Sequence, residues 1–126
     1  MHLVLDIDDT ITHAPEFFQA LTHALVGARV TVITYREERD EAAAELEAIG
    51  VRHDDLITSR DTRYPLTPGE AMDAWKARIV MGLGADVFFE DMPEVIHRIE
   101  PPVKVFMTCD TVMREWIRDA VHARDR

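Results

Sequence analysis

The segment LVLDIDDT, residues 3–10, carries the strongest structural signal in this sequence. An apolar run that stops abruptly at acidic residues is typical of a buried strand that leads into a polar loop. Four further strand-like runs follow it, and helix-like segments separate them. The sequence therefore predicts strands that alternate with helices, which is the pattern of a mostly parallel sheet with helices on both faces.

The expected elements follow from β-branched and aromatic runs, from helical spacing and from turn residues. Strands are expected at residues 3–7, 30–34, 56–58, 86–89 and 103–107. Helices are expected at residues 15–27, 37–49, 68–81 and 93–99, and in a last amphipathic segment that Asp110 caps. The third helix is expected to open at a capping box formed by residues 67–70. Together these elements predict an α/β, Rossmann-like three-layer sandwich of about five strands, in one domain over residues 1–126.

Composition narrows the class of protein further. The 126 residues are 47% hydrophobic, with 14 Lys and Arg against 24 Asp and Glu, for a net charge of −10. A chain of this length can bury a core without disulfides, and the single cysteine, Cys109, favours a cytoplasmic location. No stretch approaches the roughly 20 apolar residues of a membrane span. The negative charge disfavours binding to membranes and to long nucleic acids.

Polar residues follow three of the expected strands. The first strand ends in the stretch 6–10, the second ends in residues 34–36, and the fourth leads directly into Glu90 and Asp91. Because ligands of such sheets lie beyond the carboxyl ends of the strands, we expect these side chains to converge at one edge. Clustered carboxylates repel one another unless a cation lies between them, and ligation by oxygen alone favours Mg²⁺.

Two alternatives for these acids remain open. Asp6, Asp8 and Asp9 could form and cap a turn without binding anything, as aspartate often does. Asp91 could begin a capping box with Glu94 for the next helix.

Lys76 provides an independent constraint. On a helical wheel it falls in the same arc as Met72, Trp75 and Ile79, which would face the core. A lysine that points toward a core is unfavourable unless its amine meets a carboxylate or reaches water. The acidic edge of the sheet would supply a carboxylate, and the alternative is a lysine whose stem covers the apolar edge while its amine stays in solvent.

In the order Asp6-x-Asp8-x-Thr10, Thr34, Lys76 and Glu90-Asp91, these residues resemble the four motifs of the haloacid dehalogenase-like (HAD) phosphohydrolase superfamily. The resemblance extends from Leu3 to about Ile99. Within the superfamily the chain looks most like the phosphatase domains of polynucleotide kinase-type repair enzymes and small nucleotidases. The resemblance implies a HAD-like fold and a Mg²⁺-dependent phosphomonoester hydrolase that works through an aspartyl-phosphate.

The same resemblance implies roles for individual residues. Asp6 would be the nucleophile, and Asp8 would protonate the leaving oxygen and then activate water. Thr34 and Lys76 would hold the transferring phosphate, and an arginine at the position of Arg36 is common in the similar phosphatases. Arg36 could instead be a solvated charge that pairs with a neighbouring acid, Glu37 or Asp40.

For the metal, the resemblance implies ligation by Asp6, by the backbone carbonyl of Asp8 and by an acid of the fourth motif. Asp91 is favoured as the inner ligand by similarity to members that carry Asp-Asp there. Glu90 departs from that pattern, and its role stays open between the outer shell and a pairing with Lys76. Thr10 completes the first motif without an assigned role.

The intervals between the motifs are too short to hold a cap domain. By resemblance, capless members act on large or exposed phosphoesters or use a neighbouring subunit as a cover. We therefore expect a phosphorylated small molecule or a nucleotide as substrate, and a homo-oligomer as one arrangement. The loop at residues 59–66 could touch substrate through Arg60 and Arg63, or it could be an ordinary solvent-exposed loop.

Other residues predict less. Trp75, Phe88, Phe89 and Trp116 are expected in the core, and the six histidines show no zinc-ligand spacing beside Cys109.

Two other functions are alternatives to the hydrolase. One is a catalytically inactive HAD-fold binding or regulatory protein. The other is a receiver-type phosphoacceptor domain, which the chain resembles less because no acid ends its third expected strand.

Overall fold

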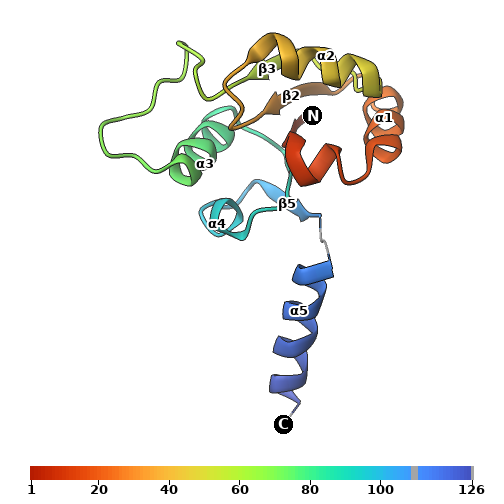
Figure 1. Ribbon diagram of the computed structural model, residues 1–126, viewed down its shortest axis with the longest axis vertical. Coiled ribbons are helices and arrows are strands. Elements are labelled where there is room, and N and C mark those ends of the chain that lie inside the picture. The colour runs from red at the N-terminus through yellow and green to blue at the C-terminus, as the bar shows by residue number, and fades with distance from the viewer. Residues whose placement is uncertain (109–110, 126) are drawn as a thin grey trace.

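Five strands form one open, parallel sheet in the computed structural model, which describes residues 1–108 and 111–125 (Figure 1). The order of the strands across the sheet is β3-β2-β1-β4-β5. The strands are β1 (His2–Leu5), β2 (Arg29–Ile33), β3 (Asp55–Ile57), β4 (Val87–Glu90) and β5 (Lys104–Met107). This arrangement confirms the predicted α/β, Rossmann-like fold.

Four helices cover the two faces of the sheet, namely α1 (Pro15–Ala24), α2 (Arg39–Ile49), α3 (Met72–Gly82) and α4 (Pro93–Ile96). A last helix, α5 (Thr111–Arg124), follows β5. Residues of α1 and α2 pack on one face, and residues of α3 and α4 pack on the other. From β1 the strand order extends to β2 and β3 on one side and to β4 and β5 on the other. The position between β1 and β4 is therefore the topological switch point, where ligands bind in such sheets. The helix cap predicted at Asp110 lies outside the described residues, as does Cys109.

The strands β1 and β2 are apolar because both of their faces are buried, whereas alternate residues of the edge strand β5 are exposed. Leu5 packs with Phe18 of α1 and Leu46 of α2 on one side of the sheet. Phe88 packs with Trp75 of α3 on the other side. This two-sided burial explains why the strands appear in the sequence as continuous apolar runs rather than as an alternating pattern.

The start of α3 differs from the prediction. The stretch Thr67–Glu70 does not open a helix, because Gly69 has a left-handed φ of +78° and the Glu70 amide donates to the Thr67 carbonyl (3.0 Å). These contacts close a turn, and α3 begins at Met72. The capping-box prediction was therefore wrong, although the Glu70 carboxylate does accept a hydrogen bond from the Thr67 amide (3.2 Å).

Helix α5 projects away from the sheet (Figure 1). Trp116, expected in the core, is 61% exposed, because no element covers the apolar side of the helix at that position in the described part of the chain. Trp75 and Phe88 are buried as predicted. Within the described residues, no helix combines the length and apolar character that crossing a membrane would require.

Candidate active site

Three acids meet at the switch point of the sheet. Asp6 follows β1 directly, Glu90 is the last residue of β4, and Asp91 follows it. Each offers a carboxylate oxygen, and these oxygens lie within 4.8 Å of one another. The convergence that the strand ends predicted is therefore present for these three residues.

The loop after β1 is shaped so that it holds the Asp6 carboxylate. Residues Ile7–Ile11 form an irregular helical turn, which extended backbone at Asp8 and a left-handed φ of +59° at Asp9 interrupt. Aspartate tolerates the left-handed conformation better than most residues do. The turn brings the Thr10 hydroxyl to Asp6, where it donates a hydrogen bond to Oδ2 (2.9 Å).

Lys76 reaches this cluster from α3 and is buried, with 1% of the residue exposed. Its Nζ lies 2.5 Å from Asp6 Oδ1 and 2.8 Å from Glu90 Oε1. The ring of Tyr35 lies beside the amine, with its centroid 4.7 Å from Nζ. The lysine thus meets carboxylates as expected, and the alternative of an amine in solvent is wrong.

Glu90 occupies a more central place than its open assignment suggested. Its Oε2 accepts hydrogen bonds from the backbone amides of Asp91 (3.0 Å) and Met92 (3.3 Å). Its Oε1 is buried and, apart from the ion pair with Lys76, has no hydrogen-bond partner among the described residues. Asp91 does not cap α4, because the residue before that helix is Met92 and no side chain caps it.

The donor set fits a hard divalent cation. All three acids present oxygen, which Mg²⁺ prefers, and the buried Oε1 atom of Glu90 has no polar partner other than the Lys76 amine among the described residues. Lys76 supplies one positive charge against three carboxylates, so a further cation would offset the remaining repulsion. The residues that could hold it are Asp6, Glu90 and Asp91.

Burial and charge shift the pKa values of the cluster in different directions. Burial, together with the charge of Glu90, raises the pKa of Asp6 more than Lys76 and Asp91 lower it. Burial also opposes ionisation of Glu90, but the charge of Lys76 and the hydrogen bonds from Asp91, Lys76 and the Met92 amide together outweigh it and lower the pKa of that carboxyl. For Lys76 itself, burial favours the neutral amine, yet the charges of Asp6 and Glu90 raise its pKa, so the amine stays protonated.

The pKa of Asp91 predicts how the stability of the metal-free protein depends on pH. Burial, together with Glu90 and Asp6, raises this pKa from 3.8 to about 8. The folded state therefore binds a proton that the unfolded state releases, and stability should fall as pH rises from about 4 to about 8. After allowance for partial exposure, the loss should be on the order of 1–2 kcal/mol.

Urea unfolding in the presence of a chelator, measured between pH 5 and pH 8.5, would check this expectation. Asp91→Asn should flatten the profile, because the amide does not titrate. A wild-type profile that rises over this range would contradict the assignment of the shift to Asp91.

The side chain of Asp8 is not brought into the cluster. It is 58% exposed, and Arg36 donates to both of its oxygens, at 2.7 and 3.1 Å. These hydrogen bonds lower the pKa of Asp8 and keep it ionised. Arg36 also contacts Glu45 (2.5 Å), so the alternative in which it pairs with Glu37 or Asp40 is wrong.

Thr34 and Tyr35 lie beside the cluster, at the end of β2. Thr34 is buried, and its hydroxyl accepts a hydrogen bond from the Arg36 amide (3.1 Å). The Tyr35 hydroxyl is buried without a hydrogen-bond partner in the described residues, and burial raises its pKa to about 12. Sequence reasoning overlooked Tyr35, although its place directly after Thr34 at a strand end was a usable signal.

Comparison with known proteins supports the fold. No protein-family model matches the sequence, and no curated protein matches it. A chain in the solved structure of the Pnkp1/Rnl/Hen1 complex superposes with a TM-score of 0.60 and 16% sequence identity, over 84% of this chain and 45% of that chain. At this identity the likeness concerns the fold alone, and this chain spans less than half of the length of that one.

Proposed function

We propose that this protein is a Mg²⁺-dependent phosphomonoester hydrolase that works through an aspartyl-phosphate on Asp6. The observation that carries the proposal is the buried contact at the switch point between the Asp6 carboxylate and the Lys76 amine, with Glu90 and Asp91 beside them. Such a cluster of buried charges is unfavourable for stability alone, because each charge must be removed from water. The order of the motifs in the chain supports the same chemistry.

Asp6, Glu90 and Asp91 would hold Mg²⁺, with the backbone carbonyl of Asp8 as a further ligand by resemblance to HAD phosphatases. When bound, the ion supplies positive charge that lets a phosphate dianion approach a carboxylate. Lys76 adds a fixed positive charge at the same point, and with Thr34 it would hold the phosphate oxygens.

In the first step, a carboxylate oxygen of Asp6 attacks phosphorus, and the bond from phosphorus to the ester oxygen breaks. The hydrogen bond from Thr10 and the ion pair with Lys76 fix the orientation of the Asp6 carboxylate for this attack. The departing alkoxide oxygen takes a proton from the carboxylic acid of Asp8.

In the second step, water attacks the aspartyl-phosphate, Asp8 accepts a proton from the water, and inorganic phosphate leaves. Asp8 can act as an acid only when it is free of Arg36, which keeps it ionised in the free protein. In the proposed mechanism, the substrate phosphate competes for Arg36 and releases Asp8 to take up a proton and turn toward the leaving group.

A panel of phosphoesters tests this function. Sugar phosphates, nucleoside 3′- and 5′-monophosphates and short phosphorylated oligonucleotides should be assayed for release of phosphate, with Mg²⁺ and with excess EDTA. We expect hydrolysis of at least one substrate with Mg²⁺, and a loss of about 10²-fold or more after chelation, because the like charges are then no longer neutralised.

Restoring Mg²⁺ to the chelated protein should restore turnover, which controls for unfolding. Hydrolysis that persists at full rate in EDTA would contradict the metal dependence. A folded, Mg²⁺-binding protein that turns over no phosphoester would instead favour the inactive binding protein as its function.

A further inference from the structure

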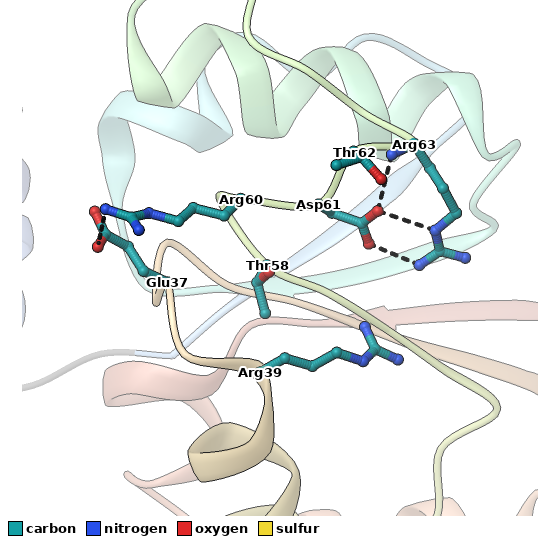
Figure 2. A pocket seen from close by; sticks show the side chains of 7 residues that line it. All are labelled: Glu37, Arg39, Thr58, Arg60, Asp61, Thr62 and Arg63. Atoms are coloured by element: carbon teal, nitrogen blue, oxygen red, sulfur yellow. Dashed lines mark hydrogen bonds and ion pairs between the residues drawn. The ribbon is translucent and has the colours of Figure 1, made fainter.

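Beside the proposed catalytic cluster, a cavity of about 510 Å³ opens at the carboxyl end of β3 (Figure 2). Its lining includes three arginines, Arg39, Arg60 and Arg63, and the hydroxyl-bearing residue Thr58. Figure 2 shows Thr58 between the side chains of Arg39 and Arg60. We call this cavity the arginine pocket.

The arginine pocket lies on the same edge of the sheet as the cluster. Strands β1, β2 and β3 are adjacent and parallel, and Ile33 pairs with Ile57, so Thr34 and Thr58 follow neighbouring strands at equal height. Since adjacent strands are about 4.8 Å apart, the ends of β1 and β3 are separated by about 10 Å. The amide of Ser59 also donates to the Arg36 carbonyl (3.1 Å), which joins the pocket loop to the site.

Arginines are concentrated at this edge, although the chain carries a net charge of −10. Four of its 14 basic residues, namely Arg36, Arg39, Arg60 and Arg63, lie at or beside the arginine pocket. Acids accompany them, because Glu37 and Asp61 also line the pocket. The cations that an anionic substrate can use are therefore those whose acidic contacts are weak or absent.

The arginines of the pocket differ in how firmly they are held. Arg63 is fixed by hydrogen bonds to Asp55 and Asp61, which neutralise it. Arg60 contacts Glu37 at 2.9 Å, but these side chains are 69% and 56% exposed. An exposed pair of this kind contributes little to stability, so a phosphate can replace Glu37 as the partner of Arg60.

Among the arginines of the pocket, Arg39 has the weakest acidic contact, because it lowers the pKa of the nearby Asp61 without forming an ion pair with it. Its guanidinium donates to the backbone carbonyl of Leu56. Across residues 1–108 and 111–125, no carboxylate forms an ion pair with it. Most of its five donors therefore remain available, and a guanidinium matches the geometry of phosphate oxygens.

We propose that the arginine pocket binds a second phosphate of the substrate, through Arg39 and Arg60, while the first phosphate is removed at Asp6. This inference rests on the proposed function, and it narrows the substrate class to molecules that carry a second phosphate near the one that is removed. A bisphosphorylated sugar, a nucleoside bisphosphate and a short oligonucleotide share this chemistry.

The test compares matched substrates that carry one phosphate or two. Fructose 6-phosphate with fructose 1,6-bisphosphate is the sugar pair, and cytidine 5′-phosphate with cytidine 3′,5′-bisphosphate is the nucleoside pair. A trinucleotide with a terminal phosphate is the third arm, and the preferred arm identifies the source of the second phosphate. The variants are Arg60→Gln and the double variant Arg39→Gln, Arg60→Gln, with Arg98→Gln as the control, since Arg98 is an exposed arginine paired with Asp73.

We expect the double variant to lower kcat/KM for the preferred two-phosphate substrate by about tenfold, and Arg60→Gln to lower it by about threefold, because charge-assisted contacts are lost. The one-phosphate partner and the Arg98→Gln variant should be unaffected. Binding of the same substrate to the Asp6→Asn background, measured by calorimetry, should weaken by a similar factor when the two arginines are replaced.

The outcomes separate this inference from the proposed function. If either arginine variant affects both substrates of a pair equally, or affects neither, the arginine pocket does not bind a second phosphate. Turnover of one-phosphate substrates would leave the hydrolase proposal standing in that case. Conversely, binding that depends on the two arginines in a protein without turnover would support the pocket and contradict the hydrolase. Arg60→Gln keeps the test decisive if loss of the Arg39 contact to Leu56 impairs folding.

Discussion

Replacing Asp6 by asparagine is expected to abolish phosphoester hydrolysis, with kcat falling by at least about 10⁴-fold. Asparagine has the same shape as aspartate and can still accept the hydrogen bond from Thr10, so the loop after β1 should keep its course. The amide oxygen, however, is a poor nucleophile and cannot form the aspartyl-phosphate. The measurement is release of phosphate from the best substrate of the panel, with Mg²⁺ in excess.

Asp9→Asn is the matched control for this substitution. It changes the same functional group only three positions along the chain, at a residue that is exposed and lies outside the carboxylate cluster. Asn also tolerates the left-handed backbone that Asp9 adopts, with φ at +59°. We expect Asp9→Asn to retain most of the activity. An Asp6→Asn protein with the same activity as Asp9→Asn would refute Asp6 as the nucleophile.

Replacing Lys76 by methionine should have the largest effect on stability. Methionine fills a similar volume but removes the cation that contacts Asp6 at 2.5 Å and Glu90 at 2.8 Å. Two buried carboxylates would then lack a compensating charge, and loss of one partner from a buried ion pair typically destabilises by about 3–5 kcal/mol. Urea unfolding in the presence of a chelator would measure this loss in the free energy of unfolding.

Two further variants isolate the cause. Lys104→Met replaces the other lysine of the chain, which is exposed at the start of β5, and should change stability by less than about 0.5 kcal/mol. Adding Glu90→Gln to Lys76→Met should recover part of the loss, because one of the two uncompensated charges is removed. If Lys76→Met unfolds at the wild-type urea concentration, the buried contacts do not have the energetic role assigned to them.

Much of the fold could be predicted because its signals are local. Apolar runs marked all five strands, and the acids after the first and fourth strands indicated where the chain would converge. Lys76 was predictable because a charged residue inside an apolar arc requires a partner, and the acidic edge supplied one. Gly50 likewise indicated where the second helix ends, and it caps α2 with a left-handed φ of +85°.

What could not be predicted depends on side-chain orientation and on tertiary context. The pairing of Arg36 with Asp8 joins residues 28 positions apart, and neither spacing nor composition reveals which acid an arginine selects. The capping-box pattern at Thr67 was overridden by the left-handed turn at Gly69. Trp116 was assigned to the core because helical periodicity shows that a face is apolar but not whether anything covers it.

The central strand β1 carries a further consequence. It is paired on both sides, with β2 and β4, whereas β5 forms one margin of the sheet and contributes no carboxylate to the cluster of Asp6, Glu90 and Asp91. The margin is nevertheless joined to the site, because the hydroxyl of Thr108, directly after β5, donates to the Asp9 carbonyl (3.0 Å) and lies 3.4 Å from the Thr10 hydroxyl. Fraying of β5 would therefore loosen the loop in which Thr10 orients the Asp6 carboxylate, and substitutions in the C-terminal margin would be felt at the reacting groups.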